Sequence, residues 1–414
     1  MTKRVLMVAY HFPPMNQSSG IQRTLRFAQY LPEYGWEPAV LTVHERAYSS
    51  VSQASMSEVP ENLQVRRAFA LDAGRHLSLR GVYPGWLALP DRWVSWWLGG
   101  VTAGLAMIRR LKPDVLWSTY PIATAHLIGY SLQRLTGIPW ITDFRDPMAE
   151  FNEPTKAHLN KVLQWIEYQA LKHCKRAVFA APGALELYAE RYPEIPRSRM
   201  VVIENGYDES VFARAEQTAN AGAGRSGPLT LVHSGTIYAA ARDPRGFFSA
   251  LSEAQRAGSI GPDSLKVVLR ATGCDDYVRE LISRYGVHQI VTLEPSIAYQ
   301  AALAEMLAAD GLLLLQAANC NYQIPAKLYE YLRAKRPILA LTDPAGDTAA
   351  VLRDAGIDTI APLDSQDMIM RELMRFVDLI RLGTAPVAPA AKIATASRRY
   401  RTAELASLLD EVAG

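Results

Sequence analysis

The chain has 414 residues, of which 49% are hydrophobic, and a chain of this length normally divides into more than one hydrophobic core. Lys and Arg total 44 against 41 for Asp and Glu, so the net charge of +3 gives no sign of a nucleic-acid-binding surface. The three cysteines are scattered without any Cys-x-x-Cys spacing, which argues against a disulfide framework or a structural zinc site and favours a reducing, cytoplasmic location. The first apolar run is too short for a signal-peptide core, so we expect no export by that route.

The first half of the chain alternates short apolar runs with amphipathic segments, which is the pattern of an α/β protein. Its predicted strands are 4–10, 37–43, 115–119, 140–143, 177–180 and 200–203. Its predicted helices are 22–34, 122–135 and 159–173. The segment 213–228 is rich in small residues and is predicted to be a loop near a domain junction.

The second half restarts the same alternation. Its predicted strands are 229–233, 265–270, 289–293, 311–315 and 337–341. Its predicted helices are 246–256, 275–285, 299–309, 326–334 and 348–355. We therefore predict an α/β fold of two doubly wound, Rossmann-like domains, 1–205 and 206–389, which face each other across a cleft at the carboxyl ends of their strands.

The most informative segment, 321–331, follows the buried strand predicted at 311–315. Pro325 suits the first turn of a helix, whose free N–H groups would point to an anion bound at the carboxyl end of the sheet. Lys327 would lie near the same anion, and Glu330 one turn later would be placed to accept hydrogen bonds from two ribose hydroxyls. These residues predict a nucleotide-sugar site, although a lysine and a glutamate three residues apart also commonly form a solvated surface pair.

Polar residues also follow two predicted strands of the first half. The loop after the first strand starts at His11 and ends at Gly20, which would give the backbone close access to an anion or an acceptor. Asp143, Arg145 and Asp146 follow a middle strand, where cleft residues belong, but such residues also form structural ion pairs. His11 is likewise open to a functional or a structural role. The dinucleotide pattern Gly-x-Gly-x-x-Gly is absent, which argues against an NAD enzyme.

Residues 82–110 are rich in tryptophan, and the stretch 93–108 has no charged side chain. This stretch is shorter than the roughly 20 residues that span a bilayer, but tryptophans beside arginines suit a segment at a membrane surface. The alternative is an aromatic-rich core helix with a loop, containing Trp93, that lines an acceptor pocket. Both interpretations are open, and the first would suit a polyprenyl-diphosphate glycan acceptor at the inner face of the membrane.

Five motifs, in this order, resemble the GT-B-fold glycosyltransferases, and among them the glycosyltransferase family 4-like enzymes. The resemblance covers nearly the whole chain and rests on Tyr10-His11-Phe12-Pro13-Pro14 through Gly20, Asp143-Phe144-Arg145-Asp146-Pro147, Asn205-Gly206-Tyr207-Asp208, His233-Ser234-Gly235-Thr236 and Ile324 to Tyr331. It implies transfer of a hexose-like sugar from a nucleoside diphosphate donor such as a UDP-sugar to an acceptor hydroxyl, usually with retention of configuration. It also implies a last helix, here 395–412, which returns to the first domain, so 390–414 is assigned to that domain.

The resemblance also implies roles for particular residues. Family members carry two glutamates in the donor site, and Glu330 matches the second, which binds the ribose. Tyr322 stands in the place of the first, so Asn321, Tyr322 and Gln323 take over sugar recognition or the donor differs from the common hexoses. The predicted donor-binding residues are Gly20, Gly235, Thr236, Arg242, Asn321, Tyr322, Gln323, Ile324, Pro325, Lys327 and Glu330.

The family usually places an Arg and a Lys after the opening strand of the second domain, to neutralise the diphosphate. Here Thr236 stands near the Arg position, and Arg242 is the best candidate for the Lys, with Arg245 as an alternative because the spacing is altered. Preorganised cations of this kind stabilise the negative charge that builds on the leaving diphosphate. The predicted catalytic residues are Lys327, Arg242, Asp143 and His11, and the predicted acceptor-side residues are Arg145, Asp146 and Trp93.

No Asp-x-Asp turn follows a predicted strand, so we expect neither a metal ion nor another cofactor. The expected partners are a nucleotide-sugar donor and a glycan or polyprenyl-diphosphate glycan acceptor, as in the synthesis of a surface polysaccharide or glycoconjugate. Two alternatives are open: a GT-B-fold nucleotide-sugar epimerase, and a catalytically silent partner subunit, which Tyr322 at the glutamate position suggests.

Overall fold

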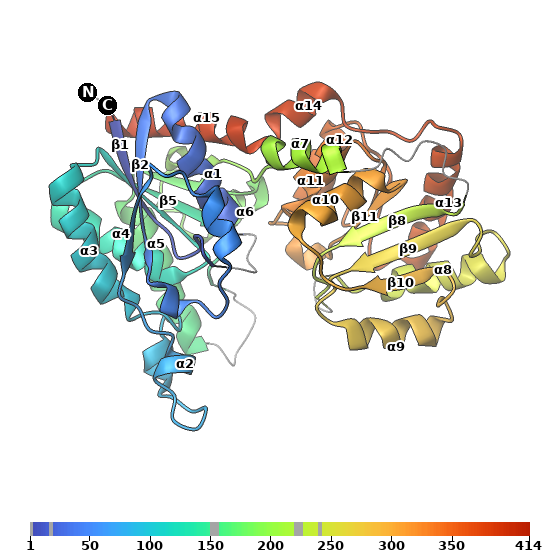
Figure 1. The fold of residues 1–414 in the computed structure, drawn as a ribbon, viewed down its shortest axis with the longest axis horizontal. Helices are drawn as coiled ribbons and strands as arrows, with labels where there is room; N and C mark the ends of the chain where they lie inside the picture. The colour runs from blue at the N-terminus through green and yellow to red at the C-terminus, as the bar shows by residue number, and fades with distance from the viewer. Residues whose placement is uncertain (1–2, 16–19, 150–156, 219–226, 239–241) are drawn as a thin grey trace. The chain divides into compact units, whose positions relative to one another are not determined.

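The structure, a computed structural model, describes residues 3–15, 20–149, 157–218, 227–238 and 242–414. The chain forms two compact units (Figure 1), the first made of residues 1–205 and 398–414 and the second of residues 206–397. The chain thus leaves the first unit at Asn205 and returns to it at Arg398. Each unit has its own sheet and its own hydrophobic core.

The first unit is built on a sheet of seven parallel strands in the order β3-β2-β1-β4-β5-β6-β7. The strands are β1 (Lys3–Val8), β2 (Trp36–Val43), β3 (Gln64–Ala68), β4 (Val115–Thr119), β5 (Trp140–Arg145), β6 (Arg176–Phe179) and β7 (Met200–Val202). The flanking helices are α1 (Gly20–Tyr30), α2 (Ala73–His76), α3 (Trp96–Leu111), α4 (Ala123–Thr136), α5 (Ala157–His173), α6 (Pro182–Arg191) and α15 (Arg398–Ala413). Because the strands are covered by helices, most of them are runs of buried apolar residues.

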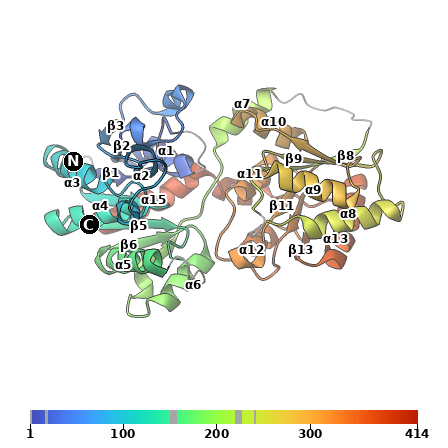
Figure 2. The ribbon, with the colours of Figure 1, turned by 90° about the horizontal axis from the view of Figure 1, so that it is seen from below.

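The second unit repeats the plan with six parallel strands in the order β10-β9-β8-β11-β12-β13 (Figure 2). They are β8 (Leu229–Ser234), β9 (Leu265–Arg270), β10 (Val291–Glu294), β11 (Gly311–Leu315), β12 (Ile338–Leu341) and β13 (Ile360–Ala361). The helices are α7 (Glu209–Thr218), α8 (Arg245–Arg256), α9 (Asp275–Tyr285), α10 (Tyr299–Ala308), α11 (Lys327–Ala334), α12 (Asp347–Asp354), α13 (Gln366–Arg381) and α14 (Ala390–Thr395). The α/β class and the two parallel sheets agree with the sequence prediction.

Two of the predicted boundaries differ from the structure. The segment 213–228 was expected to be a loop, but α7 occupies its first part, and 219–226 lies outside the described residues. The helix forms because the Asp208 side chain accepts a hydrogen bond from the Ser210 N–H at 2.8 Å, which caps the helix start. The expected return to the first unit at 390 falls instead at Arg398, because α14 still belongs to the second unit.

Most of the uncharged stretch 93–108 forms α3, which packs on the sheet of the first unit. Trp96 is fully buried, and added Cβ atoms at Gly100 and Gly104 would collide with Ile128 and Leu132 of α4. These glycines therefore allow the two helices to approach closely. Among the described residues, no helix has the length and apolar character needed to cross a bilayer. The inner face of α3 is thus a core element, as the packing interpretation predicted.

Candidate active site

The site predicted in the second unit lies at the carboxyl edge of its sheet, where β8 and β11 end side by side. After β8, Gly235 adopts φ = 117°, a conformation that strongly favours glycine. A Cβ atom on Gly235 would lie 2.9 Å from the Lys327 Nζ, so the missing side chain also makes room for the lysine. Lys327 is the first residue of α11, which follows β11 in the chain. Pro325 precedes this helix, and its carbonyl accepts a hydrogen bond from Leu328.

Lys327 contacts a histidine that was part of a recognised motif but was not among the predicted site residues. The Nδ1 of His233 lies 2.9 Å from the Leu313 carbonyl, so this nitrogen must carry the proton. The other ring nitrogen, Nε2, is then an acceptor and lies 3.4 Å from the Lys327 Nζ. Burial, together with the nearby Lys327 charge, holds the pKa of His233 well below its usual range. His233 therefore orients the lysine as a neutral acceptor.

The charge on Lys327 is poorly compensated within the protein. Burial and the nearby Arg242 guanidinium lower the pKa of Lys327 to about 7, although the Glu330 carboxylate acts in the opposite direction. Arg242 donates through Nη1 to the Thr236 carbonyl at 2.7 Å, which fixes it beside the loop after β8. A bound diphosphate would supply the negative charge that these two cations lack.

Arg245, the alternative cation, has a different environment. Its Nε donates to the Asp243 carboxylate at 2.6 Å, and this exposed pair lies at the start of α8. The structure thus brings together Lys327, Arg242, Gly235 and Thr236, as the sequence predicted for the diphosphate site, while the charge of Arg245 is already paired.

The predicted ribose-binding glutamate has a partner that sequence inspection missed. The Tyr299 hydroxyl, at the start of α10, donates a hydrogen bond to the Glu330 Oε1 at 2.5 Å. Tyr299 is distant from Glu330 in sequence and belongs to no recognised motif, so the sequence did not indicate this contact. Tyr299 therefore limits the orientations of Glu330.

The predicted sugar-recognition turn is held in place from within. The Gln316 amide nitrogen donates to the Cys320 and Gln323 carbonyls, both at 2.8 Å. The Asn321 amide nitrogen donates to the Asp343 carboxylate at 2.7 Å, so this side chain supports the turn. Ile324 is buried and Tyr322 is half-buried. The Asn321 amide nitrogen therefore supports the turn, while its buried Oδ1 has no hydrogen-bond partner among the described residues.

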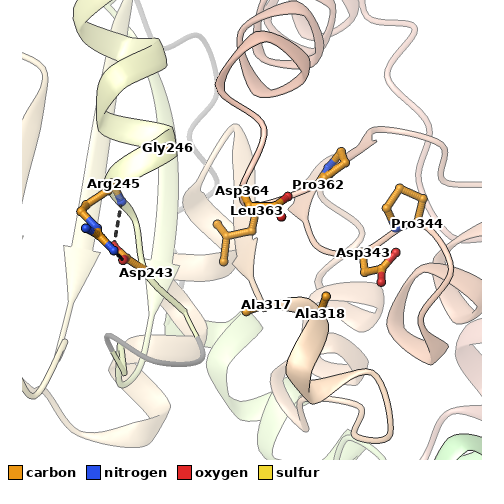
Figure 3. A pocket seen from close by; sticks show the side chains of 10 residues that line it. All are labelled: Asp243, Arg245, Gly246, Ala317, Ala318, Asp343, Pro344, Pro362, Leu363 and Asp364. Carbon is orange, nitrogen blue, oxygen red and sulfur yellow. Dashed lines mark hydrogen bonds and ion pairs between the residues drawn. The ribbon is translucent and has the colours of Figure 1, made fainter.

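A cavity of about 470 Å³ opens at the same edge of the second unit (Figure 3). It is lined by Asp243, Arg245, Gly246, Ala317, Ala318, Asp343, Pro344, Pro362, Leu363 and Asp364. Three of these are carboxylates, and the only cation among them is paired with Asp243. Such a lining is unfavourable for a diphosphate, and Lys327 and Arg242 are not part of it.

In the first unit, Asp143 of the predicted motif forms a buried ion pair with Arg23. Arg23, on α1, donates to both carboxylate oxygens at 2.8 and 2.9 Å, and the Thr119 hydroxyl donates at 2.8 Å. Arg23 also donates to the carbonyls of Ile203 and Glu204, so it ties α1 to β5 and to the end of β7. The Asp143 carboxylate is fully buried and fully engaged. Asp143 therefore forms a structural ion pair, one of the two roles that the sequence left open, and its catalytic role stays a prediction.

The remaining predicted residues of the first unit gather at the carboxyl end of β5. Arg145 adopts φ = 59°, and its Nη1 lies 3.4 Å from both the Gly20 and Tyr120 carbonyls. Burial lowers the pKa of Arg145 and raises that of Asp146. Burial and the Arg145 charge lower the pKa of His11 to about 3, so this imidazole is neutral and a weak base near pH 7.

Trp93 packs at the same edge but against different neighbours. Its Nε1 donates to the Ala47 carbonyl at 3.2 Å, and its ring lies 4.6 Å from the Tyr10 ring, centre to centre. The Tyr10 hydroxyl donates to the same carbonyl at 3.0 Å. Trp93 therefore anchors its own segment to the sheet.

Comparison with known proteins agrees with this architecture. Residues 19–206 match the family model described as "Glycosyl transferase 4-like domain". Sucrose-phosphate synthase from Thermosynechococcus elongatus is similar over 99% of this chain and 98% of its own, with 12% identity and a TM-score of 0.67. HepE from Anabaena, in complex with UDP and glucose, is similar over 99% and 100%, with 13% identity and a TM-score of 0.66.

An epimerase has the same architecture. The UDP-GlcNAc 2-epimerase from Neisseria meningitidis, bound to UDP-GlcNAc, is similar over 99% of this chain and all of its own, with 11% identity and a TM-score of 0.55. No curated protein sequence matches the chain. The chain has the GT-B fold, and residues 19–206 match a glycosyl transferase 4-like domain, in agreement with the resemblance found in the sequence motifs.

We predict that Asp143→Asn strongly destabilises the first unit. The substitution leaves the Arg23 guanidinium buried without its charge partner, and losses of about 3–5 kcal/mol are typical of such changes. Denaturant unfolding of the full chain should show an earlier first transition. Glu186→Gln, which breaks the exposed Arg197–Glu186 pair of the same unit, is the control and should have little effect on this transition. Equal effects of the two substitutions would contradict the structural role of Asp143.

We also predict that UDP binding weakens as the pH rises. The free protein has a Lys327 pKa of about 7, and a bound diphosphate raises that pKa, so above pH 7 binding must take up a proton. Affinity should then fall by up to about tenfold per pH unit between pH 7 and 9. Calorimetry in buffers of different ionisation enthalpy measures this proton uptake. Lys327→Met should abolish it and Lys266→Met, at an exposed lysine of β9, should keep it, whereas uptake in both variants would refute the assignment.

Proposed function

We propose that the chain transfers a sugar from a UDP-sugar or related nucleoside diphosphate sugar to an acceptor hydroxyl. The observation that supports this best is the pair of cations Lys327 and Arg242 beside Gly235, at the carboxyl edge of a parallel sheet, with the lysine pKa lowered to about 7. A site of this kind gains from a bound diphosphate more than from any neutral ligand. HepE, a structural neighbour, has been seen with UDP and with UDP-glucose, in agreement with a uridine donor.

The proposed reaction needs little proton chemistry from the protein. The bond between the anomeric carbon and the diphosphate oxygen breaks, its electron pair stays on the diphosphate, and Lys327 and Arg242 balance the charge that develops. The acceptor oxygen attacks from the same face, so the configuration is retained, and the departing phosphate takes the acceptor proton. No protein base is required, which suits a His11 pKa of about 3 and a fully engaged Asp143 carboxylate. The two cations take the place that a metal ion has in other glycosyltransferases, so activity should not depend on divalent metal.

For the acceptor we propose a glycan or a polyprenyl-diphosphate glycan, in the synthesis of a surface polysaccharide or glycoconjugate in the cytoplasm at the inner face of the membrane. Arg145 and Asp146 lie at the carboxyl end of β5 and would position the acceptor. The family match of the first unit and the tryptophan-rich segment of that unit support this assignment.

The decisive measurement is donor turnover with a panel of nucleoside diphosphate sugars, with and without glycan acceptors, in the presence of a metal chelator. Lys327→Met should reduce turnover of the accepted donor by about 10²–10³-fold, because one preorganised cation on the leaving group is lost. Lys266→Met should be close to wild type. Equal turnover in Lys327→Met and wild type would remove the proposed site.

The same panel separates the two alternatives. An epimerase, which the fold also accommodates, would convert the nucleotide sugar without acceptor and exchange a carbon-bound hydrogen with solvent deuterium. A silent partner subunit would neither transfer nor hydrolyse any donor. Either result would replace the proposed function.

A further inference from the structure

A short hairpin in the first unit, residues 77–86, takes no part in the candidate site. Leu79 and Val82 exchange two backbone hydrogen bonds, at 2.9 and 3.1 Å, around Arg80 and Gly81. Both turn residues have positive φ, 53° and 82°, which is the geometry of a tight two-residue hairpin turn. Figure 1 shows this segment as a loop that extends beyond α2, away from the sheet of its unit. We call it the apolar hairpin.

The apolar hairpin exposes four large hydrophobic side chains, and three of them are exposed by 70% or more. Leu79 is 81% exposed, Val82 is 74% exposed and Trp86 is 70% exposed. Single exposed hydrophobic residues are ordinary, but three on one short, hydrogen-bonded segment form a patch of the kind that marks an interaction surface. The hydrogen-bonded turn holds Leu79 and Val82 at neighbouring positions, so they can enter a partner together.

Every exposed charged side chain from residue 73 to residue 98 is basic, namely Arg75, Arg80 and Arg92. The two acidic residues near these positions are turned inward. Asp72 is buried and accepts hydrogen bonds from Arg92, and Asp91 accepts two from Thr124, at 2.8 and 2.9 Å. The outer surface therefore combines an apolar tip with basic flanks, which complements an anionic lipid surface.

The segment that carries the hairpin is fixed to the carboxyl edge of the first sheet. Its two arms are joined by the Ala73 N–H, which donates to the Arg92 carbonyl at 2.8 Å. The arm after the hairpin is held by Trp93, which donates to Ala47, in the loop that follows β2. Because α2 follows β3, the hairpin projects from the edge where Arg145 and Asp146 lie. A membrane at the hairpin would thus meet the edge assigned to the acceptor.

We propose that the apolar hairpin docks the first unit on an anionic lipid bilayer, with Leu79, Val82 and Trp86 in the interfacial layer and Arg75 and Arg80 near the lipid phosphates. Docking itself is independent of the proposed reaction. The further consequence, that the bilayer presents a lipid-linked acceptor to this edge, rests on the proposed function.

Co-sedimentation of the full chain with vesicles tests the docking. Wild type should bind vesicles that contain phosphatidylglycerol and should bind pure phosphatidylcholine vesicles much less. The triple variant Leu79→Ser/Val82→Ser/Trp86→Ser should lose at least tenfold in apparent partitioning. A matched control, Leu135→Ser/Trp165→Ser/Leu382→Ser, removes three other exposed hydrophobic side chains and should bind like wild type.

A charge variant tests whether the basic side chains contribute to docking. Arg80→Glu, at the exposed hairpin tip, should weaken binding to phosphatidylglycerol vesicles at low salt by several-fold and have less effect at high salt. Equal binding of wild type and the hairpin triple variant, or equal losses in the hairpin and control triples, would overturn the proposal. Circular dichroism and the thermal midpoint check that both triple variants are folded.

Two further measurements keep the outcomes distinct. If light scattering shows a wild-type dimer that the hairpin triple variant loses, while vesicles are not bound, the hairpin is a self-association surface and the lipid proposal is wrong. Donor turnover with a soluble acceptor should be unchanged in the hairpin triple variant. Vesicle binding without any donor turnover in wild type would refute the proposed function and leave the docking intact.

Discussion

The arrangement of this protein depends on one constraint: within each sheet every strand is parallel to its neighbours, so every strand of a unit ends at the same edge. Segments that are far apart in sequence therefore meet there. In the second unit the loop after β8 supplies Gly235 and Arg242, while the segment after β11 supplies Lys327. In the first unit the same rule brings His11 and Arg145 to one edge. The functional proposals concern residues at these two edges.

Two groups of buried charged side chains lie at these edges, and they differ in whether other groups of the protein balance their charge. The Arg23–Asp143 pair is bidentate and supported by Thr119, so it is complete without a ligand. Lys327 instead faces a neutral His233 and a second cation, Arg242. Holding its pKa near 7 costs the free protein on the order of 5 kcal/mol below that pH, because the unfolded chain keeps the lysine fully protonated. An anion that relieves this cost binds more tightly, which is why incomplete compensation indicates a ligand site.

The sequence predicted the strands and helices that depend on local residue patterns. It did not predict contacts between side chains that lie far apart in the chain. The run 311–315 is uniformly apolar and was predicted as the strand β11, whereas β3, an edge strand of mixed polarity, was not predicted. Arg23 lies on an amphipathic helix, where an arginine normally indicates the solvent face, so its pairing with Asp143 was missed. The contact of Tyr299 with Glu330 joins α10 to α11, and no motif spacing encodes it.

Because the sequence does not show contacts between distant residues, it does not distinguish a residue that binds substrate from one that supports the site. Asp143 lies near the carboxyl end of a strand and Asn321 follows one, and from sequence alone both positions indicate a site residue. In the structure, Arg23 and Thr119 donate to both carboxylate oxygens of Asp143, and the Asn321 amide nitrogen donates to the Asp343 carboxylate, while the Asn321 Oδ1 has no hydrogen-bond partner among the described residues. A side chain whose polar atoms already have partners inside the protein would have to break them to bind a substrate, at a cost comparable to the gain. Lys327 would lose less on binding a substrate, because its contact with the neutral His233 is long, at 3.4 Å. For this reason the donor site is assigned from Lys327 outward, and the Asn321 amide supports its turn, whereas Asp143 stabilises the first unit.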